Sequence, residues 1–357
     1  GVGKTALAAK LASAYASQSG GVLWLRVDNP RLEDLLVRIG RAYQITEVTT
    51  NESPLGFIGA VENTLRTNKP LVVLDGRIQP DVAARFISRC VNGLPMIIAN
   101  QDKIDGPWAA LPLTHLESEQ AANLFKQEAR ITDDTQDIDV YGLVKLVDYM
   151  PLGIVIAART LAANKMAAED LLKQMSPVAK AAGANSPAVA LTVAFSKLNG
   201  ALQGLILMLA ATFEGRASAE VISKMSNAPV ESVQQAMNIL AQLYFVERTR
   251  RYDTPYYALH PLVQAFAQAG LRKSGKLTTL QATMQDTVIA YVQTHAAAGN
   301  DDKLAAEMDN VLATARWASI NMQEGDTVNS LVTGLTQAGD FIRERGYLYD
   351  LIQLRGM

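Results

Sequence analysis

The sequence predicts an α/β domain with a parallel sheet, followed by domains that are almost entirely helical. Three observations support this prediction. The chain opens on the glycine-rich stretch "GVGKT", directly before a helical segment. Up to about residue 113, short apolar runs alternate with amphipathic segments, which is typical of a parallel sheet covered by helices. Beyond about residue 116 the strand pattern nearly stops, apart from one hairpin signal near residue 253.

The elements of the first domain, residues 1–115, follow from this alternation. The segment "LVVLDG" is a β-branched apolar run closed by glycine, which is typical of a central strand. We expect strands at 20–28, 70–76 and 94–100, a further edge strand around Leu111 and Leu113, and helices at 6–17, 30–43, 54–67 and 80–90. Helices on both faces of the sheet are therefore predicted.

The rest of the chain divides into three predicted parts. Residues 116–189 form a helical subdomain, with 179–189 as a linker. Residues 190–272 contain helices at 200–213, 217–225 and through Val233–Tyr244, then a hairpin around Asp253–Pro255 and a helix at Pro261–Leu271. That order describes a winged-helix domain. Residues 273–357 are helical throughout and predict the start of a repeat array.

Composition excludes several classes of protein. At 357 residues and 49% hydrophobic, the chain can bury more than one core and is too apolar for disorder. A net charge of -2 means that the chain has no excess of positive charge to attract nucleic acid or an anionic membrane, so we expect neither as a direct partner. The single cysteine, Cys90, allows no internal disulfide, and we expect a cytoplasmic location. The longest apolar run, 201–213, is too short to span a bilayer.

The opening stretch matches the end of the phosphate-binding pattern G-x-x-x-x-G-K-[ST]. Backbone N–H groups of such a loop, and the positive end of the helix that follows, surround phosphate oxygens. Lys4 would neutralise the β- and γ-phosphates, and the hydroxyl of Thr5 would hold Mg²⁺. The predicted nucleotide-binding residues of the loop are Gly1, Val2, Gly3, Lys4, Thr5 and Ala6.

A second motif supports the first. The apolar strand "LVVLD" ends in Asp75, where a carboxylate can orient Mg²⁺ and its water. Asp75 is therefore the catalytic candidate and, together with Thr5, the metal-binding candidate. Many ATPases of this kind carry a second acid at the next position, but here it is Gly76. We expect slow or absent hydrolysis unless another carboxylate, such as Asp81, takes that role.

These motifs and their order resemble the NB-ARC proteins of the STAND class of signalling NTPases, over about residues 1–272. After the phosphate loop and the Mg²⁺ strand, "LPLTHLESEQAANLF" resembles the passage into the helical subdomain. "YMPLGIVIAARTL" resembles the family's "GLPLAL" helix start, and "YYALHPLVQAFA" resembles its winged-helix motif. The resemblance implies a P-loop NTPase domain whose first strand is missing from this chain, so we expect the chain to be a piece of a longer protein.

The resemblance also implies roles for later residues. Pro151 and Leu152 would line the adenine and sugar side of a pocket for ATP or ADP with Mg²⁺. His260 would reach the β-phosphate of ADP and tie the winged helix to the nucleotide domain. Two positions depart from the family pattern. Pro261 stands where an aspartate is frequent, and Gln101 stands where an arginine commonly senses the γ-phosphate. Arg77 is an alternative source of that charge.

The function implied is a molecular switch that is ADP-bound and closed at rest. A signal at the C-terminal TPR-like repeats would permit exchange for ATP, and the open form would oligomerise and activate an effector domain N-terminal to this chain. Three alternatives stay open: a DNA-binding regulator that uses the basic wing "ERTRRY", a P-loop kinase or other metabolic NTPase, and a helical scaffold with a degenerate nucleotide site.

Overall fold

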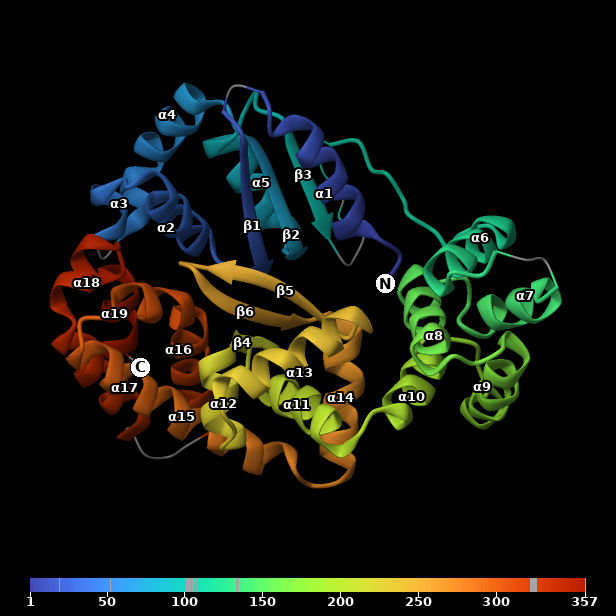
Figure 1. Cartoon of the computed structure of the whole chain (residues 1–357). Helices are drawn as coiled ribbons and strands as arrows, with labels where there is room; N and C mark the ends of the chain where they lie inside the picture. Colours follow the sequence, from blue (N-terminus) through green and yellow to red (C-terminus); the bar gives the residue numbers. More distant parts are fainter. Residues whose placement is uncertain are drawn as a thin grey trace. The chain divides into compact units, whose positions relative to one another are not determined.

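The computed structural model describes residues 1–18, 20–51, 53–100, 104, 106, 108–132, 135–321 and 326–356 (Figure 1). These residues form two compact units. The sheet unit comprises residues 3–113 and 338–356, and the helical unit comprises residues 1–2 and 114–337. Within the described part of the chain, the backbone passes from one unit to the other after Val2, after Leu113 and after Gln337.

The sheet unit is built on three parallel strands in the order β1-β2-β3. They are β1 (Val22–Asp28), β2 (Leu71–Arg77) and β3 (Met96–Asn100), and the helices between them are α1 (Lys4–Tyr15), α2 (Leu32–Tyr43), α3 (Thr46–Thr49), α4 (Ile58–Asn68) and α5 (Pro80–Cys90), with a 3₁₀ turn at Pro54–Phe57. The three strands expected between residues 20 and 100 are confirmed, and so is their parallel arrangement.

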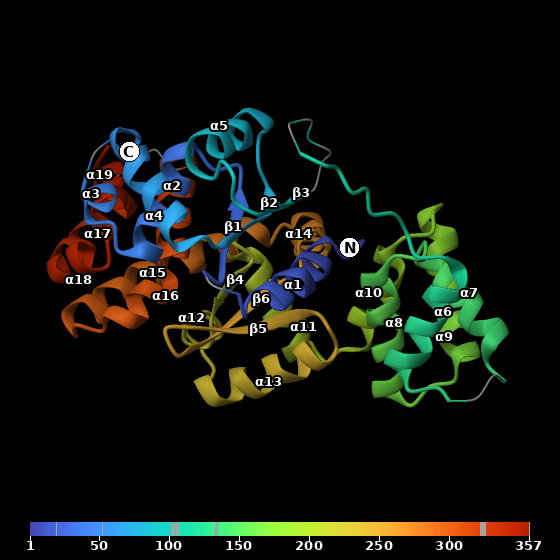
Figure 2. The same ribbon diagram turned by 90° about the horizontal axis from the view of Figure 1, so that it is seen from above.

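Side chains that alternate along the strands build two cores. On one face, Leu25 and Leu74 belong to a large cluster with residues of α2, α4 and α5. On the other face, Val73 and Ala99 pack against Ala8 and Ala12 of α1. Figures 1 and 2 show α1 and α5 on opposite faces of the sheet. Because alternation has a period of two, the side chain of Asp75 lies on the same face as Val73, beside α1.

The edge strand expected around Leu111 and Leu113 is wrong: among the described residues from 108 to 113, the backbone forms no strand. Leu111 is 72% exposed, so this apolar residue contributes nothing to the core of the sheet. Pro112 cannot donate a backbone hydrogen bond to a neighbouring strand, which disfavours pairing here.

The helical unit begins with five helices in sequence. They are α6 (Ser118–Ala129), α7 (Asp137–Leu146), α8 (Pro151–Asn164), α9 (Ala168–Ala182) and α10 (Pro187–Lys197). The linker expected at 179–189 is corrected, because α9 runs to Ala182 and α10 begins at Pro187. Gly183 ends α9 in the left-handed conformation (φ 68°), and the proline starts the next helix in its first turn.

A small antiparallel sheet in the order β4-β6-β5 follows, surrounded by helices. Its elements in chain order are α11 (Gly200–Ala211), β4 (Arg216–Ser218), α12 (Ala219–Ser226), α13 (Val230–Gln242), β5 (Val246–Arg251), β6 (Thr254–Leu259) and α14 (Pro261–Lys273). The predicted hairpin is confirmed. Its two turn residues, Tyr252 and Asp253, both have positive φ (45° and 58°), which matches the twist of a two-residue hairpin loop. Strand β4 has only three residues, which are too few to show an alternating pattern in the sequence.

Five further helices follow α14. They are α15 (Leu277–Ala297), α16 (Asp301–Asn321), α17 (Asp326–Gln337), α18 (Gly339–Glu344) and α19 (Leu348–Arg355). The first three belong to the helical unit and the last two to the sheet unit. In the portion of the chain that the structure describes, no helix combines the length and the apolar character that crossing a membrane requires.

Candidate functional site

The phosphate-loop candidate lies at the N-terminus of α1. Gly3 precedes the helix in the left-handed conformation (φ 97°), which a glycine adopts without a steric cost. No side chain caps this helix end, and its first turn contains no acidic residue. The positive end of the helix dipole is therefore not compensated by its own sequence, and Lys4 adds a full positive charge beside it. This arrangement suits an anion with several oxygens.

Thr5 and Asp75 meet across 70 positions of sequence. The Thr5 hydroxyl Oγ1 donates a hydrogen bond of 2.8 Å to Oδ1 of Asp75. The packing of α1 on β2 brings them together, because Ala8 and Ala12 lie against Val73 on the face that also carries Asp75. A hydroxyl and a carboxylate are the oxygen ligands that Mg²⁺ accepts, so the residues present fit this ion.

Gly76 is a glycine for a geometric reason. Its φ is 136°, and a Cβ added there would lie 2.0 Å from the backbone oxygen of Val27 on the paired strand. No side chain fits at this position, so the end of β2 cannot carry a second acid directly after Asp75. Asp81, the alternative carboxylate, is exposed at the start of α5 and pairs with Arg85 at 3.1 Å.

Asn100 is a further residue at this edge of the sheet, and it is not among the residues predicted from the sequence. This residue ends β3, is 8% exposed, and accepts a hydrogen bond of 3.1 Å from the backbone N of Ile78 through Oδ1. It therefore fixes the chain just after β2, two positions beyond Gly76. The sequence shows an amide at the end of an apolar strand, but its register with Gly76 is seen only in the structure. Gln101, the predicted γ-phosphate sensor, lies outside the described residues, whereas Arg77 is exposed at the end of β2.

In the helical unit, the start of the chain contacts the predicted adenine-side segment. The backbone N of Leu152 approaches the carbonyl oxygen of Gly1 at 3.4 Å. A Cβ on Gly1 would lie 2.9 Å from Cδ1 of Leu262 and 3.2 Å from Cβ of Leu152, so a side chain here would require these leucines to shift. Pro151 occupies the first turn of α8, as predicted for a helix start. Val2 is half-buried, and Ala6 is exposed in the first turn of α1.

His260 caps α14 rather than filling an apolar core. Its Nδ1 accepts a hydrogen bond of 3.1 Å from the backbone N of Leu262, and the side chain is half-buried. Because Nδ1 is an acceptor, the neutral ring carries its proton on Nε2, which makes that atom a donor. A phosphate oxygen can accept a hydrogen bond from such a donor. Lys4 and His260 belong to different units, so their shared contact with one phosphate stays a prediction.

Comparison with known proteins identifies the fold. No protein-family model matches the sequence, and no curated protein matches it. Among solved structures, the chain is similar to a Signal Transduction ATPase with Numerous Domains (STAND) protein with a tetratricopeptide repeat sensor from Pyrococcus horikoshii, with a TM-score of 0.63 and 13% identity. The match covers 99% of this chain and 49% of that one, so the chain spans about half its length.

A second structure, the ORC2 protein of Aeropyrum pernix, covers 76% of this chain and 86% of its own at 17% identity, but its TM-score of 0.29 is too low to indicate a shared fold. The STAND structure and the parallel sheet together confirm the predicted fold class. The chain therefore has the fold of the STAND-type protein, an α/β domain on a parallel sheet followed by helical domains.

Proposed function

We propose that this chain is the nucleotide-operated part of a STAND-type molecular switch that binds ADP or ATP with Mg²⁺. The contact between Thr5 and Asp75 is the observation that carries the proposal. It joins the helix after the phosphate loop to the end of the central strand, and it forms the pair of oxygen ligands that a nucleotide-bound Mg²⁺ needs. The similarity in fold to the STAND protein supports the same conclusion.

In the proposed complex, each motif has one task. Backbone N–H groups from Gly1 to Ala6 and the ammonium of Lys4 bind the phosphates. Thr5 and Asp75 hold the metal ion and position its water. Pro151 and Leu152 contact the adenine and sugar side, which the approach of Leu152 to Gly1 supports. His260 donates from Nε2 to the β-phosphate.

The switch is proposed to hydrolyse ATP slowly or not at all. Polarising the attacking water requires a general base, and the position after Asp75 cannot carry one because Gly76 admits no side chain. A slow reaction suits a switch, since the bound nucleotide then defines a lasting state. ADP would hold the closed resting form, whereas ATP would favour an open form that oligomerises.

The remaining parts of the switch are proposed from the resemblance and from the order of elements. Helices α11–α14 with the β4-β6-β5 sheet are the winged-helix domain, and α15 onward begins the TPR-like repeats that receive a signal. The open form would act on an effector domain, as the resemblance implies. A cytoplasmic location completes the proposal.

Thermal unfolding with and without ADP-Mg²⁺ tests the central claim. A ligand that binds only the folded state stabilises it by about 2.7 kcal/mol when its concentration is 100 times its dissociation constant. We expect a clear rise in the melting temperature of the wild-type chain and none for Lys4→Ala. Lys10→Ala, on the exposed side of α1, is the matched control and should respond as the wild type does. A wild-type chain that ADP-Mg²⁺ leaves unchanged contradicts the proposal and supports the degenerate scaffold.

Two further alternatives are disfavoured by specific residues. Helix α13, which would be the recognition helix of a DNA-binding winged helix, contains no Lys or Arg. On the wing, Arg251 is engaged by Asp309 at 2.8 Å. We therefore expect no salt-dependent shift of duplex DNA. A metabolic kinase would need an acceptor site, and steady-state transfer to a small phosphate acceptor would support that alternative.

A further inference from the structure

The C-terminal helices are divided between the two units. Helices α15–α17 belong to the helical unit, whereas α18 and α19 belong to the sheet unit. Ala338 is the single residue between α17 and α18, and its backbone (φ -91°, ψ 43°) is not helical. The chain therefore leaves one unit and joins the other within one residue, after a helix of 12 residues.

Two polar clusters fix the first part of this tail to the helical unit. In the first, Glu220 of α12 binds His295 of α15 at 2.8 Å and Lys303 of α16 at 3.3 Å. The side chains of His295 and Glu220 are 8% and 22% exposed, and that of Lys303 is 39% exposed. Helix α12 of the winged-helix candidate is thus joined to α15 and α16, the first helices of the C-terminal part.

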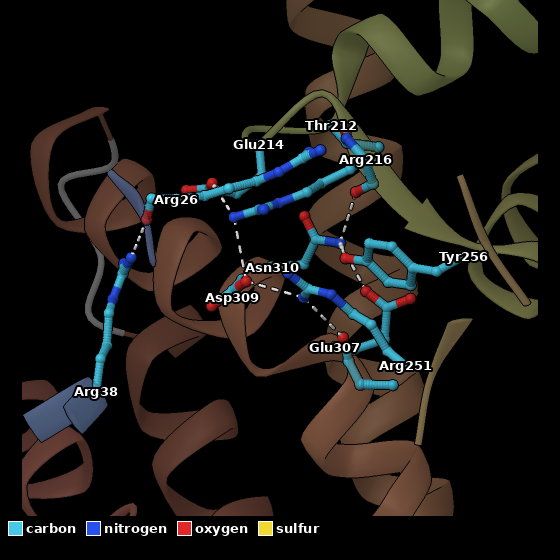
Figure 3. A network of polar contacts seen from close by, with 11 residues as sticks. Arg26, Arg38, Thr212, Glu214, Arg216, Arg251, Tyr256, Glu307, Asp309 and Asn310 are labelled. Carbon is cyan, nitrogen blue, oxygen red and sulfur yellow. Dashed lines mark hydrogen bonds and ion pairs between the residues drawn. The ribbon is translucent and has the colours of Figure 1, made fainter. Parts of the chain in front are cut away.

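The second cluster joins α16 to the small sheet (Figure 3). The buried carboxylate of Glu307 accepts from the backbone N of Ser218 at 2.6 Å. Asn310, also fully buried, donates to the backbone oxygen of Arg216 at 2.8 Å, and Asp309 pairs with Arg251. Breaking these contacts would leave buried polar groups without partners, which is costly. Helices α15 and α16 are therefore attached to the small sheet and to α12.

Arg41 of α2 makes three kinds of contact with the last part of the chain. Its Nε donates to the backbone oxygen of Gly346 at 3.1 Å, and its Nη2 forms an ion pair with Asp350. Its guanidinium also lies 4.2 Å from the ring centroid of Tyr347. One arginine thus makes a hydrogen bond, an ion pair and a cation–π contact with the segment that connects α18 and α19 and with α19 itself.

Two further contacts complete this interface, which Figures 1 and 2 show beside α2 and α3. Tyr349 is 3% exposed within the core cluster of the sheet unit, and its hydroxyl accepts from Arg31 at 3.0 Å. Gly346 has φ 70°, and a Cβ there would lie 2.8 Å from Cβ of Thr49. The loop between α18 and α19 therefore approaches α3 as closely as only a glycine allows.

We propose that α18 and α19 form a releasable latch, and that the Arg41 contacts must break before the two units can rearrange. The inference rests on the proposed switch. The sheet unit is linked to the helical unit by the chain at Val2, at Leu113 and again at Gln337. With α15–α17 fixed at one end and α18–α19 at the other, the link at Gln337 adds a restraint on any movement of the winged-helix candidate relative to the sheet unit.

Two properties of α18 and α19 favour their release from the sheet unit. Helices of 6 and 8 residues are too short to be stable alone, so α18 and α19 depend on the surface they cover. The contacts of Arg41 and Arg31 with this segment are polar, and polar contacts are frequent where domains move against each other, whereas Tyr349 adds a buried aromatic ring. A force applied to the repeats would act on the chain at Ala338 and would be transmitted to the contacts of Arg41.

Hydrogen–deuterium exchange and ADP release, both measured on the full chain, test the latch. Arg41→Ala should raise amide exchange in residues 339–355 by about tenfold while β2 stays protected, because local opening then needs less free energy. Asp350→Asn, which keeps the shape of the side chain, should act in the same direction. Both variants should release a fluorescent ADP analogue several times faster than the wild type.

Matched controls separate the latch from a general loss of stability. Arg66→Ala removes an exposed ion pair within α4, and Asp340→Asn removes one within α18, so both should match the wild type. Equal acceleration of exchange in β2 and in residues 339–355, or no acceleration in either, overturns the latch. If the wild type binds no ADP, the switch fails, whereas the exchange measurement still decides whether the last helices open separately.

Discussion

Oγ1 of Thr5 lies 2.8 Å from Oδ1 of Asp75, although 70 positions of sequence separate the two residues. The contact depends on one packing event, the burial of Ala8 and Ala12 of α1 against the sheet. It shows how two short motifs that are weak singly become one site. The helix brings a hydroxyl and an uncapped N-terminus, and the strand brings a carboxylate.

Removing the charge of Asp75 should abolish the effect of Mg²⁺ on nucleotide binding. Asp75→Asn can still accept from Thr5, but a neutral amide oxygen binds a divalent ion more weakly than a carboxylate does. We expect affinity for ADP without metal to stay near the wild-type value, and the gain from Mg²⁺ to fall by about tenfold, or 1.4 kcal/mol. Calorimetric titration with and without Mg²⁺ measures both. Thr5→Ser keeps the hydroxyl and should retain the gain; an Asp75→Asn chain with full metal dependence would contradict the assignment.

Replacing Gly76 should destabilise the chain without creating an ATPase. In Gly76→Ala the new Cβ would collide with the oxygen of Val27 and hold a positive φ, for which we expect a loss of roughly 2–4 kcal/mol in unfolding free energy. Urea unfolding measures this loss. Gly59→Ala in α4, where a Cβ meets nothing within 4 Å, should stabilise the chain by roughly 0.5 kcal/mol. Equal stability of both variants would show that the end of β2 has room for a side chain.

The role of His260 can be separated from its role as a helix cap. His260→Asn preserves an acceptor for the backbone N of Leu262, but its shorter side chain cannot reach as far as the imidazole. We expect unchanged stability without nucleotide and about tenfold weaker binding of ADP. His260→Ala should lose the cap as well, and about 1 kcal/mol of stability with it. His115→Asn is the control, since that ring is half-exposed and lies 3.4 Å from Asp148. Unaltered ADP affinity in His260→Asn would remove the histidine from the switch.

Glu307 should make stability fall as the pH rises. Burial raises the pKa of this carboxyl above its usual 4.5, against the opposing effect of the hydrogen bonds from Ser218 and Asn310. The folded chain thus holds the proton more tightly than the unfolded chain. The stabilisation that comes from holding this proton is fully present below pH 4.5. It is lost as the pH rises through the pKa of the folded state, and the free energy of unfolding then falls by up to about 1.4 kcal/mol per pH unit.

Urea unfolding of the wild type and of Glu307→Gln at several pH values checks this sign. Glutamine does not titrate, so the stability of the wild type should decline relative to that of the variant as the pH rises above 4.5. Glu119→Gln, on the exposed first turn of α6, should run parallel to the wild type. A wild-type curve that rises relative to Glu307→Gln would mean that the carboxylate is stabilised, not penalised, in its buried position.

The sequence was sufficient for elements with a strong local signal. The strand that ends in Asp75 combines β-branched residues with a closing glycine, and the hairpin at Asp253 has a polar turn between two β-like runs. Leu111 and Leu113 misled because apolar residues beside Pro112 resemble a strand although the proline cannot pair. The linker expected up to residue 189 was wrong because Gly183 and Pro187 mark a short break between helices, not a long flexible segment.

Long-range contacts explain what the sequence could not reveal. Nothing near Arg41 indicates that Asp350, 309 positions later, is its partner. The same holds for Asn100, whose role depends on its register with Gly76, and for Glu307, which resembles any glutamate of an amphipathic helix until α16 is seen against the small sheet. Such pairs form only after the elements have packed.

The burial of Tyr349 among the residues of the first domain bears on how the protein should be divided for study. A recombinant fragment cut after residue 272, where the winged-helix pattern ends, would omit an aromatic ring that the hydrophobic interior around α2 surrounds. Such a fragment would expose an apolar hollow to solvent and tend to aggregate, so domain-mapping work on this chain should retain its last twenty residues or supply them as a separate peptide.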